Sequence, residues 1–333
     1  MRVFHHCWFL TGPTASGKSA VGIELARRIG AEIVSMDSMA LYRGMDIGTA
    51  KPTPEERAAV PHHLIDVIDP WEEASLARYI EVAGRVVDEI AGRGRQVLFV
   101  GGTPLYLKGL LRGIFEGPAA DWPLRRRLAD EAGQHGPEWL HRRLAEIDPP
   151  TAARLHPNDT RRLIRAIEVF EKTGRPISQW QRQFDVDASE RPSPRVFALD
   201  WPKAELHARI DRRVEEMFAA GLVEEVRGLL ALCTEGRPRP SPLPKGEGTI
   251  RHALSRTARQ AVGYREVIEH LEGRHSLPET IELVQRHTRQ LSKRQMTWFR
   301  SLGECRFVSI AGRLSTSAVA EQIASLGQAG GTP

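Results

Sequence analysis

Short apolar runs alternate with segments of helical spacing in the first third of the chain. Residues 7–10, 32–35 and 96–100 are mainly apolar and predict buried strands, and residues 63–67 predict a shorter one. Residues 76–90 repeat their apolar positions every three or four residues, which predicts a helix. Strands that alternate with helices are typical of a parallel α/β sheet, in which ligands bind at the carboxyl ends of the strands.

The pattern changes between residues 118 and 194. This segment shows no strand pattern and holds arginine-rich helical stretches at 124–132, 139–147 and 160–174, the last with capping residues before it. Afterwards, residues 195–199 predict a strand that returns to the sheet, followed by helices at 203–220 and 222–232. The sequence therefore predicts an α/β core over 1–117, a helical insertion domain over 118–194, and a return to the core with C-terminal helices over 195–327.

Two segments lack the apolar content for a folded element. Residues 235–248 contain four prolines and three glycines and almost no apolar side chain, which predicts a disordered insert. Residues 328–333 predict a frayed tail.

Composition narrows the class of protein. The chain has 333 residues, of which 41% are hydrophobic and 27% charged, and this excludes collagen-like, disordered and membrane-spanning classes. The net charge of +5 permits a polyanionic partner without requiring one. Three widely spaced cysteines argue against a disulfide framework and a zinc finger, and we expect a cytoplasmic protein.

A phosphate-binding motif follows the first predicted strand. Its residues are Gly12, Pro13, Thr14, Ala15, Ser16, Gly17, Lys18 and Ser19, which fit G-x-x-x-x-G-K-[ST] before an amphipathic helix. Backbone amides and the helix N-terminus attract phosphate oxygens, Lys18 adds a full charge, and the Ser19 hydroxyl is placed to bind Mg²⁺. The motif indicates a di- or triphosphate and does not distinguish one nucleotide from another.

Two further polar positions follow predicted strands. Asp37 comes after the second strand, and Gly101-Gly102-Thr103 comes after the strand at 96–100, so both should lie at the same edge as the phosphate motif. From the residues alone, Asp37 could be a general base, an outer ligand of Mg²⁺ or a helix cap. Thr103 could face a substrate or make a local turn hydrogen bond.

Several segments together resemble the tRNA dimethylallyltransferase family. The resemblance spans residues 8 to about 302, and its most specific part is YRGMDIGTAKP at residues 42–52. Further matches are HHLID at 62–66, HPND at 156–159, VGYR at 262–265 and TRQLSKRQMTWF at 288–299. The resemblance implies a P-loop NTPase-like fold and the transfer of a dimethylallyl group from dimethylallyl diphosphate to N6 of adenosine 37, beside the anticodon of tRNAs that read codons beginning with U.

The resemblance also implies roles for individual residues. Asp37 would be the general base, with Thr103 beside it, and the phosphate motif together with Arg209 would bind the diphosphate, with Mg²⁺ on Ser19. It implies tRNA contacts at Asp37, Ser38, Met39, Ala40, Thr103, Arg125, Arg161, Arg162, Leu163, Ile164, Arg165, Gln260, Ala261, Val262, Gly263, Tyr264 and Arg265. Without the resemblance, Arg209 would be interpreted as a surface residue of an amphipathic helix. We expect a monomer with no membrane association.

Two positions depart from the family pattern, since Ala40 stands where many relatives have Gln and Pro104 where Gly is common. The basic segment 286–300 fits RNA phosphates, and its aromatic residues Trp298 and Phe299 predict core packing. A P-loop kinase shares the phosphate motif but leaves residues 42–52 unexplained. An RNA-binding switch of the GTPase type would need an N-K-x-D signature, which the sequence lacks.

Overall fold

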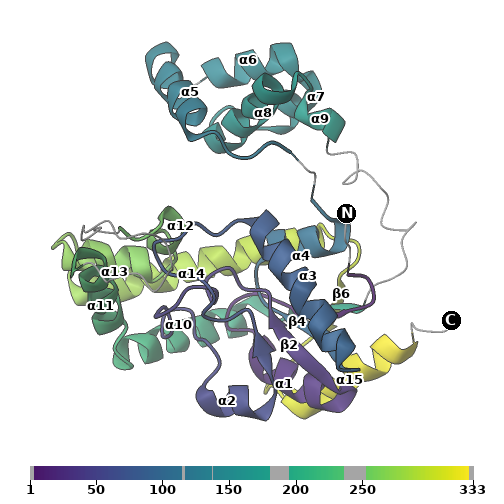
Figure 1. Cartoon of the computed structure of the whole chain (residues 1–333). Helices are drawn as coiled ribbons and strands as arrows, with labels where there is room; N and C mark the ends of the chain where they lie inside the picture. Colours follow the sequence, from purple (N-terminus) through teal and green to yellow (C-terminus); the bar gives the residue numbers. More distant parts are fainter. Residues whose placement is uncertain (1–3, 115–116, 137, 181–194, 236–252, 330–333) are drawn as a thin grey trace, which may run out of the picture. The chain divides into compact units, whose positions relative to one another are not determined.

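The computed structural model describes residues 4–114, 117–136, 138–180, 195–235 and 253–329 (Figure 1). The chain divides into two compact units, residues 112–191 and the remainder. The sequence placed the start of the smaller unit at 118 rather than 112.

The larger unit is built on a six-stranded parallel sheet with the order β3-β2-β4-β1-β5-β6. The strands are β1 (Trp8–Thr11), β2 (Ala31–Ser35), β3 (His62–His63), β4 (Gln96–Val100), β5 (Arg195–Asp200) and β6 (Arg306–Ser309). The strands predicted at 7–10, 32–35, 96–100 and 195–199 are confirmed within one residue at each end, whereas β6 was not predicted. The P-loop NTPase-like α/β class is also confirmed.

The predicted strand at 63–67 is wrong beyond its first residue. β3 comprises His62 and His63 only, because Leu64 and Asp66 have positive φ angles of 60° and 59°. Non-glycine residues in this left-handed conformation cannot continue an extended strand. The apolar pattern of HHLID therefore marks a buried turn, in which Leu64 is only 5% exposed.

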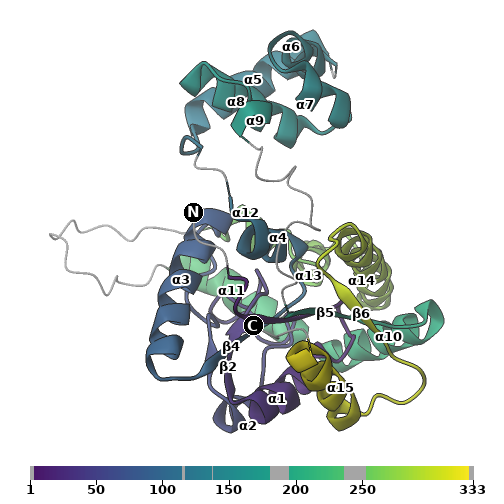
Figure 2. The ribbon, with the colours of Figure 1, turned by 90° about the vertical axis from the view of Figure 1, so that its right-hand side faces the viewer.

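Helices cover both faces of this sheet (Figure 2). Alternate strand residues point to opposite sides: Phe9, Val34 and Phe99 belong to one core, and Leu10, Leu98 and Val100 belong to the other. The first core contains residues of α3 (Leu76–Gly92), α4 (Pro104–Arg112), α11 (Leu222–Glu235), α12 (Arg256–Arg259) and α13 (Tyr264–Leu271). The second contains residues of α1 (Lys18–Ile29), α10 (Lys203–Ala219) and α15 (Thr316–Ala329).

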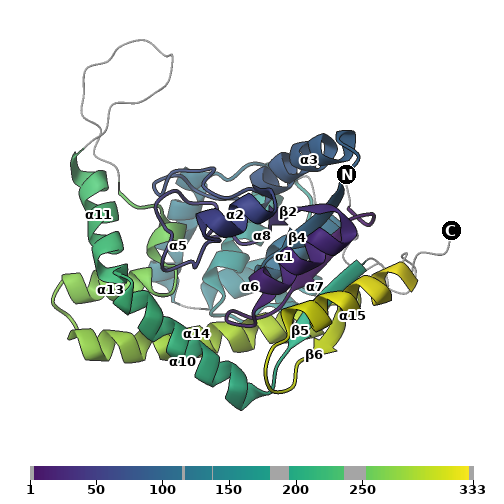
Figure 3. The ribbon, with the colours of Figure 1, turned by 90° about the horizontal axis from the view of Figure 1, so that it is seen from below.

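Two further helices complete the larger unit. α2 (Pro54–Ala59) begins with a capping box on Thr53, and the long α14 (Leu277–Arg300) begins with one on Ser276. α14 packs against α10 (Figure 3) and contributes residues to both cores. The helices predicted at 76–90, 203–220 and 222–232 are confirmed as α3, α10 and α11.

The strand order fixes where a ligand would bind. The chain leaves β1 through α1 and passes beyond β4 to reach β2, whereas after β4 it returns beyond β1 to β5. The connections diverge between β1 and β4, and open α/β sheets bind ligands at such a switch point, outside the carboxyl ends of the strands. The phosphate motif follows β1, and Gly101-Gly102-Thr103 follows β4.

The smaller unit is a bundle of short helices. These are α5 (Trp122–His135), α6 (Trp139–Ile147), α7 (Pro149–Arg154), α8 (Thr160–Thr173) and α9 (Ile177–Trp180). α5, α6 and α8 confirm the three predicted stretches, and α7 and α9 are additional. Asp159 caps α8, Gly174 ends it with a φ of 68°, and the part of this unit that the structure describes contains no strand.

A buried carboxylate holds the smaller unit together. Glu168 is 0% exposed and accepts two hydrogen bonds from Arg125, at 2.9 and 2.8 Å, and one from Arg165 at 2.6 Å. Its Oε1 also accepts from the Asp121 amide at 2.6 Å, at the start of α5. Burial by itself raises the pKa of Glu168, but these hydrogen bonds outweigh it and hold the pKa below the ordinary 4.5.

We expect Glu168→Gln to destabilise the smaller unit by about 3 kcal/mol, because it leaves two partly buried guanidinium groups without their counter-charge. The lowered pKa of Glu168 means that its stabilisation is present above pH 4.5 and is lost as the pH falls through the folded-state value. Hydrogen exchange of residues 117–180 between pH 3 and pH 7 measures this. The exposed Glu146→Gln is the control, and equal protection in the two variants would contradict the prediction.

The remaining predictions fall largely outside the described residues. Of the predicted insert 235–248, only Glu235 is described, and it is the last residue of α11. Of the predicted tail 328–333, residues 328 and 329 belong to α15, so the tail prediction is wrong for these two.

Candidate active site

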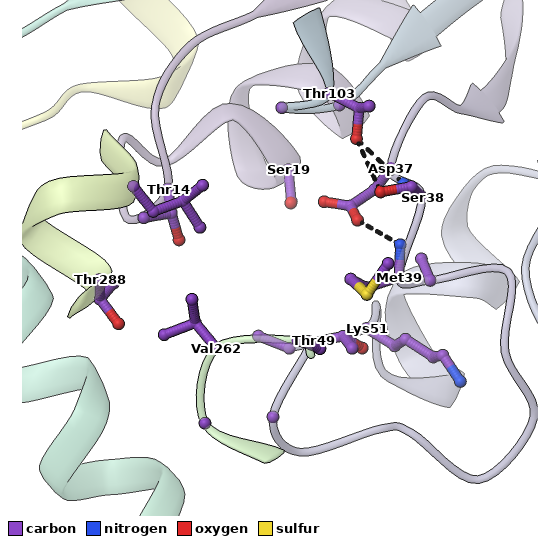
Figure 4. A pocket seen from close by; sticks show the side chains of 18 of the residues that line it. Thr14, Ser19, Asp37, Ser38, Met39, Thr49, Lys51, Thr103, Val262 and Thr288 are labelled. Carbon is purple, nitrogen blue, oxygen red and sulfur yellow. Dashed lines mark hydrogen bonds between the residues drawn. The ribbon is translucent and has the colours of Figure 1, made fainter. Parts of the chain in front are cut away.

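A pocket of about 410 Å³ lies at the carboxyl edge of the sheet (Figure 4). Thr14, Lys18 and Ser19 of the phosphate motif line it, together with Asp37 and Thr103. The predicted meeting of the three strand ends is therefore confirmed. Residues 48–52, α10, residues 260–264 and α14 complete the wall.

The phosphate loop adopts the backbone that its glycines allow. Gly12 and Gly17 have φ angles of 151° and 85°, and Ala15 shares the left-handed region at 63°. On the outer side of the loop, the Arg209 Nε donates to the Ala15 carbonyl at 2.8 Å and the Trp201 Nε1 donates to the Ser16 carbonyl at 2.9 Å. These bonds occupy two of the loop's carbonyls. The Thr14 amide donates to the Gln295 side chain and the Ser16 amide to the Pro13 carbonyl, so the later amides of the loop are the ones that would face an anion.

Several cationic groups favour an anion in this pocket. Burial lowers the pKa of Lys18 to about 8, an effect that Asp37 opposes and Arg213 reinforces. The Ser16 hydroxyl is buried without a hydrogen-bond partner. Arg294 of α14 also lines the pocket. Ser16 itself does not line the pocket, so the cationic side chains are the groups that indicate a ligand rich in acceptor oxygens.

Arg213 is a pocket residue that the sequence analysis missed. Arg209 does not line the pocket; its guanidinium lies over the Trp201 ring at 4.5 Å and its Nε bonds the Ala15 carbonyl of the phosphate loop, so its contact with a diphosphate stays a prediction. Arg213, one helical turn further along α10, lines the pocket, and burial lowers its pKa. A sequence signal existed: Arg213 interrupts the apolar stripe of α10 formed by Leu206, Ile210 and Val214.

Asp37 is the acidic residue of the pocket wall. Its Oδ1 accepts a hydrogen bond from the Met39 amide at 2.9 Å, and the side chain points into the pocket, as Ser19 does (Figure 4). This bond to the residue two positions on is an Asx turn, and because the next helix begins only at Pro54, Asp37 is not a helix cap. Its Oδ2 has no hydrogen bond to any residue that the structure describes, and so is available to accept a proton.

Thr103 positions the turn that carries Asp37. Its Oγ1 accepts from the Ser38 amide at 3.0 Å and lies 3.3 Å from the Ser38 hydroxyl (Figure 4). The close approach depends on Gly101, where a Cβ atom would lie 2.1 Å from the Met36 carbonyl oxygen. Thr103 thus bonds a residue 65 positions away rather than its own turn, and its effect on Asp37 runs through the backbone of Ser38.

The segment 42–52 is a loop held by two charged residues. Glu225 of α11 accepts from the amides of residues 46, 47 and 48 at 2.9, 2.7 and 3.3 Å, and from the Tyr264 hydroxyl at 2.6 Å. The Lys51 ammonium is buried and donates to the Tyr42 carbonyl at 2.6 Å and to two carboxylates. These bonds explain why so many residues of the segment belong to the family motif, since most of them fix the backbone that lines the pocket.

We expect Gly48→Ala to destabilise the larger unit by about 1–3 kcal/mol, because a Cβ atom there would lie 2.5 Å from the Tyr264 ring. Thermal unfolding measures the effect. The control is Gly92→Ala at the end of α3, where a Cβ atom meets nothing within 4 Å. Equal melting temperatures for the two variants would mean that the contact with Tyr264 does not constrain the loop.

The predicted tRNA contacts in the larger unit fall into two groups. Ser38, Met39, Ala40 and the segment 260–264 line the pocket. Arg265 does not; its guanidinium contacts Glu266 at 2.6 Å and His287 at 3.0 Å. Pro104 is the first residue of α4, where proline suits the start of a helix, so this departure from the family pattern is accommodated.

The predicted tRNA contacts in the smaller unit have different surroundings. Arg125 and Arg165 hold Glu168, and the side chains of Leu163 and Ile164 are buried in the helical core. A contact of RNA with Leu163 or Ile164 would therefore involve the backbone, and it stays a prediction. The remaining predicted contacts, Arg161 and Arg162, are exposed in the first turn of α8.

α14 carries the basic segment 286–300. Four of its cationic residues are exposed: Arg286, Lys293, Arg294 and Arg300. Phe299 is 0% exposed and belongs to the core, as predicted, and Trp298 is half-buried.

The residues present fit a magnesium ion bound mainly by a ligand's phosphates. The exposed Ser19 hydroxyl and the Asp37 carboxylate both line the pocket, and no group of three or more His, Cys, Asp or Glu side chains suited to a metal occurs in the described part of the chain. Mg²⁺ commonly takes one or two protein ligands together with substrate phosphates, and this donor set matches that pattern.

Comparison with known proteins decides the family. A family model described as IPP transferase matches residues 40–302, and one described as isopentenyl transferase matches residues 5–66. The chain belongs to the IPP transferase family. Among curated members, the tRNA dimethylallyltransferases of Rhodopirellula baltica and Geobacter metallireducens are both 47% identical to it; the matches cover 89% and 92% of this chain and 86% and 93% of theirs.

Solved structures of IPP transferase relatives agree. The tRNA isopentenylpyrophosphate transferase of Bacillus halodurans is 34% identical with a TM-score of 0.66, and the match covers 98% of this chain and 96% of that one. A eukaryotic dimethylallyltransferase acting on tRNA is 26% identical with a TM-score of 0.70, covering 91% of this chain and 73% of that one. No helix in the described residues is long and apolar enough to cross a membrane.

Proposed function

We propose that this IPP transferase moves a dimethylallyl group from dimethylallyl diphosphate to N6 of adenosine 37 in tRNAs that read codons beginning with U. The observation that carries the proposal is the pocket itself, where Lys18 and Arg213 face the same space as the Asp37 carboxylate. Cations stabilise a diphosphate leaving group, and a carboxylate can accept the proton that the adenine amine must lose. The names of the relatives supply the identity of the donor and acceptor classes.

The reaction forms one C–N bond, breaks one C–O bond and transfers one proton. The N6 lone pair forms a bond to C1 of the dimethylallyl group as the C1–O bond breaks, and the bonding electrons leave with the diphosphate. Negative charge grows on the diphosphate during this step, so the phosphate-loop amides, Lys18 and Arg213 bind the transition state more tightly than the ground state. Asp37 takes the proton from N6.

Ser19 would hold a magnesium ion through its hydroxyl, with the diphosphate as the ion's main ligand. Bound there, the ion would supply further charge neutralisation to the leaving group. The chain's own contribution is to fix the diphosphate on the loop and to hold Asp37 in the same pocket.

The acceptor base must leave the anticodon stack to reach the pocket. Flipping a nucleotide out of a stacked loop costs a few kcal/mol, which contacts elsewhere on the RNA must offset. The larger unit has exposed cations on α14, and the smaller unit has exposed cations on α8. Both sets could bind RNA phosphates. We expect the enzyme to act in the cytoplasm as a monomer.

A transfer assay tests the proposal. Unmodified tRNA is incubated with labelled dimethylallyl diphosphate and Mg²⁺, and a matched tRNA carrying guanosine at position 37 is the control. Label in the first RNA alone supports the proposal. A parallel reaction with ATP tests the kinase alternative, and phosphorylation without prenyl transfer would replace the proposed function with that one.

A further inference from the structure

Gln295 of α14 joins two loops of the active site that are far apart in the sequence. Its Oε1 accepts a hydrogen bond from the Thr14 amide of the phosphate loop at 2.9 Å. Its Nε2 donates to the Gly102 carbonyl, in the loop after β4, at 2.6 Å. The side chain is 8% exposed and lines the pocket.

The two bonds require the amide group of glutamine. One partner is a donor and the other an acceptor, so only a side chain that accepts at one atom and donates at the other satisfies both. Glutamate could not donate to Gly102, and asparagine is one methylene shorter. The fit is close, because a Cβ atom on Gly102 would lie 2.8 Å from the Gln295 Nε2.

Each loop bears one half of the proposed chemistry. The phosphate loop carries Lys18, whereas Gly102 is followed by Thr103, which bonds the amide next to Asp37. The route from Thr14 through Gln295, Gly102 and Thr103 to Ser38 is therefore a chain of contacts between the diphosphate site and the base.

We propose that Gln295 is a positioning residue that fixes the spacing between the donor's diphosphate and the Asp37 carboxylate. This inference rests on the proposed function. Gln295 contacts neither reacting atom; it acts by holding the two loops at one separation while the substrates enter. Transfer rates fall steeply when reacting groups are misplaced, by about 100-fold for an error near 1 Å.

The test compares Gln295→Met, which keeps the length of the side chain and loses both bonds, with Gln285→Met. Gln285 is a matched control, since it also lies on α14 and its Nε2 bonds to Asp211 and Glu215 at 3.5 and 3.4 Å, away from the pocket. We expect Gln295→Met to lower kcat for prenyl transfer about 100-fold, with the KM for tRNA within about threefold of the wild type. Gln285→Met should keep wild-type kinetics. A Gln295→Met enzyme with wild-type kcat overturns the proposal.

A double-mutant cycle separates positioning from general destabilisation. If Gln295 acts through the loop of Thr103, then Gln295→Met should cost at least threefold less in kcat when Thr103 is already alanine. Independent, additive losses overturn the proposal. Should Gln295→Met fail to fold, Gln295→Asn tests the same point, because its amide cannot reach both partners.

Calorimetric binding of inorganic pyrophosphate provides a readout that does not depend on prenyl transfer. Losing the bond to Thr14 should weaken pyrophosphate binding by about three- to tenfold, because the phosphate loop is less preorganised. Unchanged binding overturns the role of Gln295 at the phosphate loop. A wild-type enzyme that binds pyrophosphate but transfers no prenyl group would instead reject the proposed function.

Discussion

Asp37→Asn is expected to lower kcat for prenyl transfer by about 10²–10⁴-fold, the range typical of a lost general base. Asparagine keeps the shape of the side chain and its oxygen can still accept from the Met39 amide, so the turn should persist. What is lost is the ability to take the proton from N6. The exocyclic amine of adenine is a poor nucleophile, and without a base it would carry a positive charge as the bond forms.

The measurement is a single-turnover transfer assay combined with binding of the tRNA. Binding of the tRNA should stay within about threefold of the wild type. Asp37 is negatively charged, so removing its charge takes away no attraction for the RNA phosphates. Asp69→Asn serves as the control, since Asp69 forms a surface ion pair with Arg43 that contributes little to stability. Turnover by Asp37→Asn within threefold of the wild type would mean that another group removes the proton.

The second large effect is expected at Lys18. Lys18→Met removes the charge that the phosphate motif itself carries into the pocket and should reduce kcat/KM for dimethylallyl diphosphate by about 10³-fold, with a comparable loss of pyrophosphate binding. Lys18→Arg keeps the charge but places a wider, planar group in a tight loop, so it should restore only part of the activity. Both effects follow from the position of Lys18 in the pocket wall beside Arg213.

Isothermal titration with inorganic pyrophosphate and steady-state kinetics with varied donor measure the loss. Lys203→Met is the matched control, because Lys203 is exposed at the start of α10 and does not line the pocket. If Lys18→Met binds pyrophosphate as tightly as the wild type, then the diphosphate does not lie on the phosphate loop and the proposed orientation of the donor is wrong.

Much of the active site could be predicted from sequence because its residues follow strand ends. A phosphate motif after one strand and Asp37 and Thr103 after two others must meet at one edge when the strands are parallel, and they do. The short third strand could not be predicted reliably, because an apolar turn with positive φ at Leu64 and Asp66 has the same hydrophobic pattern as a strand. Arg213 was missed beside Arg209 because two arginines one helical turn apart look alike in sequence, and only the neighbouring elements decide which of them lines the pocket.

By itself, the sequence determined the parallel sheet, the helical character of the smaller unit, the phosphate loop and the family. These depend on local periodicity and on motifs confined to a few residues, and both can be recognised in the amino-acid sequence without the structure. Only the tertiary structure showed that Arg213 lines the pocket, that Glu225 holds the loop 46–48, that Glu168 pairs with Arg125 and Arg165, and that Gln295 bonds two loops 281 and 193 residues away. Each of these depends on which side chains meet across elements distant in the chain. The sequence around a hydrogen-bond donor or a charged residue does not reveal which distant residue will be its partner.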